Sequence, residues 1–152
     1  MKRYSLLVSV VLIGSLLFGA TTILAQQKSK KAPVMMAAGD MKWETMKNAP
    51  PGLTYVPLWG DMTKGAHGVI VKFPANAKSP LHTHSSDFKI VVISGTWVAG
   101  PEGGPEKSYG TGSYLMVPAG TRHTSGAGPD GCTFFQEGSG KFDLKPVEAP
   151  KK

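Results

Sequence analysis

The stretch SPLHTHSSDFKIVVISG, residues 79–95, places His82 and His84 just ahead of an apolar run that is typical of a strand. In a strand, residues i and i+2 point to the same face. The two imidazoles would therefore project together and could bind one divalent ion from adjacent coordination positions. The pair alone is weak evidence, because surface or core histidines also fall at this spacing. Gly95, at the end of the stretch, stands where a turn is expected.

A second group of residues follows in GSYLMVPAGTRH, residues 112–123. Pro118 and Gly120 favour a turn that ends one strand and sets the direction of the following strand. His123 begins that next strand. Each half of the β-rich region therefore carries histidine, and the loop GPEGGP at residues 100–105 separates the two halves.

The elements that must position these histidines are short extended runs separated by Gly and Pro. Val, Ile, Thr and aromatic residues dominate them, and no stretch after the first two dozen residues keeps a helical apolar period beyond about two turns. The pattern predicts an all-β sandwich or small barrel. The runs cover residues 53–59, 68–73, 88–98, 113–117 and 132–136.

Taken together, HTH, an apolar strand with Gly95, an intermotif loop and GSYLMVPAGTRH resemble the two motifs of the cupin superfamily, from Leu53 to Asp143. Four sequence segments resemble those of a bacterial group of small cupins: PLWGDM, KFPANAKSPLHTHSSDF, VVISGTW and GKFD. That group is related to the cupin-like domain of zinc-dependent anti-sigma factors. The resemblance implies a cupin-type double-stranded β-helix, or jelly-roll, barrel. It also implies one metal ion, held by the ligands His82, His84 and His123.

The chain departs from the superfamily pattern in both motifs. Ala127 stands where the second motif usually ends in Asn. Phe88 stands where the first motif usually has a metal-binding Glu. Asp87 is adjacent, but in a regular strand its side chain would point to the opposite face from Phe88, unless a bulge turns it inward. Two alternatives follow: Asp87 is a fourth metal ligand, or three histidines hold the ion and leave the remaining positions open.

The resemblance implies a small-molecule metalloenzyme of dioxygenase type, because some cupin dioxygenases bind Fe²⁺ through three histidines without a carboxylate. Fe²⁺ is the favoured ion, with Zn²⁺ or Mn²⁺ as alternatives, since three imidazoles suit each of them. A non-catalytic zinc-binding, ligand-binding or sensing module is the second hypothesis. For the trio itself, the alternative is a barrel with metal-free, hydrogen-bonded histidines. No acid–base pair accompanies the trio, so the sequence identifies no catalytic residue.

Residues around the trio carry weaker expectations. His67 is expected to be exposed or structural, and a role in supporting the site or contacting substrate is the alternative. Trp59 and Trp97 are expected to pack in the barrel wall. Cys132, the single cysteine, lies in an apolar run and is expected to be a buried thiol. The candidates for lining the cavity are Tyr114, Met116, Phe134 and Gln136, and core packing is the alternative for the three larger ones.

The first 25 residues have the outline of a secretory signal peptide: Lys2 and Arg3, an apolar run over 6–24, then Ala25. We therefore expect an exported protein, periplasmic or secreted. An uncleaved leader that anchors the chain in a membrane is the alternative. The expected organisation is a signal peptide over 1–25, a linker or N-terminal arm over 26–50, a cupin domain over 51–145 and a C-terminal tail over 146–152.

Charge argues for a soluble surface and against a nucleic-acid partner. The leader holds two of the 17 basic residues, so the remaining chain carries 15 against 10 acidic residues, a formal charge of +5. The lysines are scattered or lie in the tails, without interleaved aromatic residues. Arg122 is expected to form a surface ion pair. The expected partner is a small-molecule ligand or substrate, and pairing of two copies into a homodimer through edge strands stays open by analogy.

Overall fold

The computed structural model describes residues 32–46 and 49–148. The predicted signal peptide over 1–25 lies outside these ranges. Within them, no helix has the length and apolar character needed to cross a membrane. The regular elements belong to one compact unit that begins at Met36.

The regular elements of the described part of this unit are antiparallel strands apart from one short 3-10 helix, which confirms the all-β prediction. Buried side chains alternate with more exposed ones over residues 69–73 and 88–92, so these strand segments bury one face. The predicted domain boundaries at 51 and 145 stay predictions. The first and last strands of the described sheet, β1 and β9, are each two residues long. The elements are η1 (Ala38–Asp40), β1 (Glu44–Thr45), β2 (Thr54–Gly60), β3 (His67–Phe73), β4 (Lys78–Thr83), β5 (Phe88–Pro101), β6 (Lys107–Tyr109), β7 (Tyr114–Val117), β8 (His123–Gly138) and β9 (Lys145–Pro146).

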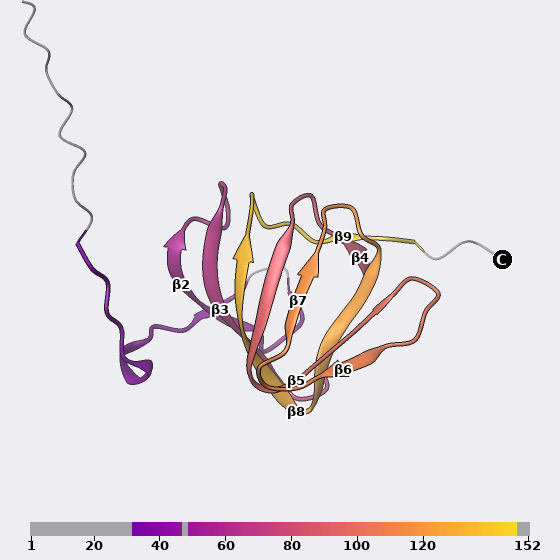
Figure 1. The fold of residues 1–152 in the computed structure, drawn as a ribbon, viewed down its shortest axis with the longest axis horizontal. Coiled ribbons are helices and arrows are strands. Elements are labelled where there is room, and N and C mark those ends of the chain that lie inside the picture. The colour runs from indigo at the N-terminus through magenta and orange to yellow at the C-terminus, as the bar shows by residue number, and fades with distance from the viewer. Residues whose placement is uncertain (1–31, 47–48, 149–152) are drawn as a thin grey trace, which may run out of the picture. The chain divides into compact units, whose positions relative to one another are not determined.

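Two long strands, β5 and β8, curl the sheet around its own interior. They pair along their lengths, from Phe88 opposite Gly138 to Pro101 opposite His123. The second half of β8 also pairs with β3, and its first half pairs with β4. β8 therefore connects β3 with β4, and β5 runs beside it along its length, as Figure 1 shows.

Gly95 lies inside β5 rather than at a turn, so the expectation of a turn there is wrong. The strand continues through it as an irregularity, with register shifts against β8 on both sides of Gly95. Its φ of +72° is left-handed, and a Cβ at this position would lie 2.2 Å from the carbonyl oxygen of Gly131. Glycine is required because the bend brings two backbones into contact.

The hydrophobic core is formed by side chains of β3, β5 and β8, together with Leu53 just before β2. Its centre is an aromatic triad of Phe73, Trp97 and Phe134, whose ring centroids lie 4.6 to 5.6 Å apart. Edge-to-face packing of this kind adds about 1 kcal/mol per pair beyond burial. The expectations for Trp97 and Cys132 are confirmed: both are buried, and burial raises the pKa of the Cys132 thiol to about 11.

Three residues expected inside or within the wall instead face outward. Tyr114 and Met116 are 60% and 47% exposed, because the alternation along β7 turns Leu115 and Val117 inward. Trp59 is 46% exposed and covers Gly68 from outside. The cavity predictions for Tyr114 and Met116 are therefore wrong.

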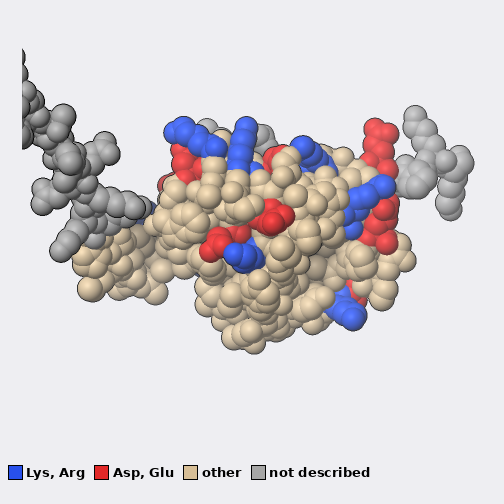
Figure 2. All heavy atoms as spheres, turned by 45° about the horizontal axis from the view of Figure 1, so that its top comes forward, with Lys and Arg blue, Asp and Glu red and all other residues tan. Residues whose placement is uncertain are grey.

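The surface carries both signs of charge in close alternation. On the face in Figure 2, basic and acidic side chains lie next to one another. Arg122 forms its predicted surface ion pair, with Glu102 at 2.7 Å. Lys89 pairs with Glu137, also at 2.7 Å. Exposed pairs contribute only about 0–1 kcal/mol each, so the apolar core is the main source of stability.

Replacing Gly95 with Ala should lower the free energy of unfolding by about 3 kcal/mol, because the left-handed φ and the contact with Gly131 both penalise a Cβ. Urea denaturation measures the change. Gly110→Ala is the control, since a Cβ there meets nothing within 4 Å and should shift stability by less than about 0.5 kcal/mol. Equal losses in the two variants would contradict the assigned geometry.

Candidate metal centre

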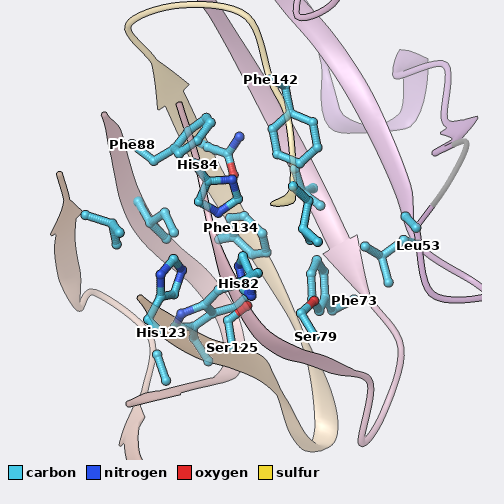
Figure 3. A pocket seen from close by; sticks show the side chains of 18 of the residues that line it. Leu53, Phe73, Ser79, His82, His84, Phe88, His123, Ser125, Phe134 and Phe142 are labelled. Atoms are coloured by element: carbon cyan, nitrogen blue, oxygen red, sulfur yellow. The ribbon is translucent and has the colours of Figure 1, made fainter. Parts of the chain in front are cut away.

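Three histidines meet at the junction of β4 and β8. His82 is in β4, directly opposite His123 at the start of β8. His84 follows just beyond the end of β4, two residues after His82. One ligand atom from each of the three lies within 4.8 Å of the others. Figure 3 shows their rings gathered on one side of a cavity. The structure thus confirms that the trio is close enough to hold one ion.

The backbone of β4 turns His82 inward. Its register against β8 shifts between Ser79 and His82, so both side chains reach the interior although they are three residues apart. From His82 the ordinary strand period then places His84 on the same face. The centroids of these two rings lie 4.8 Å apart, which agrees with the prediction from the HTH spacing that they project together.

Hydrogen bonds select the tautomer of each imidazole. The Nδ1 of His82 faces the carbonyl oxygen of Pro80 at 2.6 Å, and that of His123 faces the carbonyl of Thr121 at 2.9 Å. The Nδ1 of His84 faces the carbonyl of Asp143. A carbonyl only accepts, so each Nδ1–H donates and each Nε2 keeps its lone pair. This donor set fits a metal ion.

Burial keeps two of these imidazoles neutral. It lowers the pKa of His82 to about 4, against a smaller opposing effect of the Pro80 carbonyl. Burial also lowers the pKa of His84, where the Asp143 carbonyl opposes it. A buried cation is poorly solvated, whereas a neutral imidazole can ligate a metal without first losing a proton.

The carboxylate of Asp87 lies outside the histidine group. Its Oδ1 accepts a hydrogen bond from the Ala119 N–H at 2.8 Å. Phe88 occupies the neighbouring interior position instead, 2% exposed, with its ring centroid 4.6 Å from that of His84. The donors assembled here are three imidazoles, and a role for Asp87 as fourth ligand stays a prediction from the sequence.

The cavity beside the trio is small and uncharged, with a volume of about 70 Å³. Figure 3 shows the histidines on one side and Phe73 and Leu53 on the other. Phe134 and Gln136 line it, as predicted. Among the described lining residues the non-histidine polar side chains are Ser79, Ser125 and Gln136, and none is Asp, Glu, Lys or Arg. The space suits a small, largely apolar molecule.

His67 is separate from the trio. It is 0% exposed, which rules out the exposed alternative, and its Nδ1 faces the carbonyl oxygen of Gly65 at 2.9 Å. Its Nε2 has no hydrogen-bond partner among the described residues. Its ring packs near Phe88, at 6.1 Å between centroids.

Sequence reasoning missed the contribution of the segment after β8. Phe142 and Leu144 line the cavity, and Asp143 between them contacts His84 through its carbonyl. The available signal was the alternation of apolar Phe142 and Leu144 with the polar residues of KFDLK.

Comparison with known proteins identifies the family and the fold. A family model described as the ChrR cupin-like domain matches residues 31–140. No curated protein matches the chain. Among solved structures, the polyketide cyclase RemF from Streptomyces resistomycificus has a TM-score of 0.64 at 18% identity, covering 79% of this chain and 89% of its own. An RmlC-like cupin from Ralstonia eutropha has a TM-score of 0.61 at 19% identity, covering 78% of each chain.

A third structure, the DMSP lyase DddQ from Ruegeria pomeroyi, has a TM-score of 0.55 at 18% identity, covering 72% of this chain and 61% of its own. At these identities the likeness shows the fold alone. The cupin-type barrel predicted from the sequence is thereby confirmed.

His123→Ala should weaken Zn²⁺ binding by more than about 100-fold, because one of three donors is lost. His67→Ala is a matched control. It also removes an inward imidazole whose Nδ1 faces a carbonyl two residues earlier at 2.9 Å, yet it lies outside the trio. Competition with a chromophoric chelator measures both affinities. Similar losses in the two variants would show that the trio is not the site.

Proposed function

The chain belongs to the ChrR cupin-like domain family, and on that premise we propose that it binds one divalent metal ion through His82, His84 and His123 and acts on a small organic molecule. The observation that carries the proposal is three mutually close imidazoles, each with Nδ1 facing a carbonyl, at one side of an uncharged cavity. Such a site offers ligands for a metal and room for a substrate beside it.

The finer proposal is a metalloenzyme of dioxygenase type with Fe²⁺, and Zn²⁺ or Mn²⁺ as alternatives. Three neutral imidazoles leave the +2 charge of the ion uncompensated and several coordination positions open. When bound, Fe²⁺ would supply activation of oxygen, whereas Zn²⁺ would supply Lewis acidity. The absence of a charged side chain among the described lining residues supports chemistry without an acid–base pair.

The residues of the chain would bind, orient and shield the substrate. Phe88, Phe134 and Phe142 supply apolar walls that exclude water. The hydroxyl of Ser125 and the amide of Gln136 line the same cavity and can hydrogen-bond to oxygen atoms of the substrate. We therefore infer an uncharged or weakly polar substrate, since no described lining residue offers an ion pair.

A non-catalytic zinc-binding or ligand-sensing module is the second candidate. The match to the ChrR cupin-like domain favours it, as does the small volume of the cavity. RemF and DddQ are named as a cyclase and a lyase, so cupin barrels of this similarity serve different reactions. We also propose that the predicted leader directs export, so that either activity would take place outside the cytoplasm.

Oxygen uptake tests the enzymatic proposal. The chain is loaded anaerobically with Fe²⁺ and assayed in an oxygen electrode against a panel of small apolar phenols, enols and ketones and their charged analogues. Uptake with an uncharged compound, lost in the His82→Ala, His84→Ala double variant, would support the enzyme. Tightly held metal without uptake for any compound would favour the sensing module.

Phe88→Glu should close the open coordination positions, because the new carboxylate would lie beside His84. We expect azide to bind the Co²⁺-loaded variant at least about 10-fold more weakly than the wild type, since the carboxylate competes for the ion and offsets its charge. Visible spectra of the Co²⁺ protein measure azide binding. Phe88→Leu, which stays apolar, should bind azide like the wild type; unchanged binding in Phe88→Glu would contradict an open site next to Phe88.

A further inference from the structure

The segment after β8 crosses the mouth of the barrel; we call residues 140–147 the C-terminal strap. The strap is hydrogen-bonded to other parts of the barrel near both of its ends. Near its start, the Phe142 N–H donates to the Met62 carbonyl at 2.8 Å. Near its end, β9 pairs with β4, and the Val147 N–H donates to the Leu81 carbonyl at 3.0 Å. Figure 1 shows β9 beside β4, the strand that carries His82.

The strap supplies the hydrogen-bond acceptor for the Nδ1 of His84. His82 and His123 each direct Nδ1 to the carbonyl two residues earlier in the chain. His84 instead directs Nδ1 to the carbonyl of Asp143, 59 residues later. His84 lies beyond the last residue of β4, so its orientation depends on a distant segment while the other two imidazoles are fixed locally.

The side chain of Asp143 holds that carbonyl in place. Its Oδ1 accepts from the Ser85 N–H at 2.7 Å, and its Oδ2 accepts from the Ser85 hydroxyl at 2.6 Å. Ser85 directly follows His84, so the strap is clamped to the residue beside the ligand. A carboxylate that accepts two hydrogen bonds makes a stronger clamp than a neutral acceptor would.

The same strap closes the cavity. Phe142 and Leu144, on either side of Asp143, both line it. The Phe142 ring centroid lies 5.7 Å from those of His84 and Phe88. One short segment therefore orients an imidazole through its backbone and covers the ligand space with its side chains.

We propose that Asp143 is a positioning residue for His84, and that the C-terminal strap sets how long the site retains its metal ion. The inference rests on the proposed metal site. Without the carboxylate clamp the Asp143 carbonyl loses its fixed place, and the His84 imidazole gains rotational freedom. Partners that orient a metal-binding histidine in this way typically change metal affinity by about 10–100-fold.

The test compares Zn²⁺ release from the full chain in wild type, Asp143→Ala, Ser85→Ala and Lys145→Ala, with transfer to excess chelator followed in time. Asp143→Ala should release Zn²⁺ at least about 10-fold faster, and Ser85→Ala, which keeps the backbone bond, less so. Lys145→Ala is the matched control: Lys145 is on the same strap and contacts Asp143 from the exposed side at 3.6 Å. It should release metal like the wild type.

A spectroscopic readout separates positioning from loss of fold. In ¹⁵N-labelled, Zn²⁺-loaded protein, the Nδ1–H signal of His84 should shift or exchange faster in Asp143→Ala, while those of His82 and His123 stay in place. Equal release rates for Asp143→Ala and Lys145→Ala, or equal changes at all three histidines, would overturn the inference alone. A wild-type chain that holds no Zn²⁺ would overturn the proposed metal site as well.

Discussion

The pairing of β4 with β8 is the constraint on which the site depends. It places His82 opposite His123, residues that come from the two halves of the β-rich region. The register shift between Ser79 and His82 turns the histidine inward, and strand alternation brings His84 to the same face. A slip of one residue would send an imidazole to the outer face. The histidine trio is therefore a consequence of strand register, which β5 reinforces by pairing along the length of β8.

Burial and hydrogen bonding then set the protonation state and the tautomer of the imidazoles. Low solvent access keeps His82 and His84 neutral, and the carbonyls that face Nδ1 leave Nε2 free to donate its lone pair. Phe88 leaves the interior position beside His84 without a carboxylate. These features support the proposed ion whose charge the protein does not neutralise, next to a cavity lined by apolar side chains.

Much of this arrangement could be predicted from local patterns. The HTH spacing predicted that His82 and His84 project together, and the alternating runs predicted the strands, because both depend on the two-residue period of a strand. That His123 joins the pair followed from the resemblance of both motifs to the cupin superfamily. The inward face of β7 was mispredicted for Tyr114 and Met116, since alternation alone does not say which face is inside. The contact between Asp143 and His84 joins residues 59 apart and has no local signature, so only the folded chain brings it into view.

X-ray absorption spectroscopy at the metal edge tests the central claim most directly. The purified chain, loaded with one equivalent of Zn²⁺, should show three imidazole nitrogens at about 2.0–2.1 Å, completed by a light oxygen or nitrogen scatterer from solvent. Replacement of His82 should reduce the imidazole count. A spectrum with one imidazole or none would contradict the claim that His82, His84 and His123 together hold the ion.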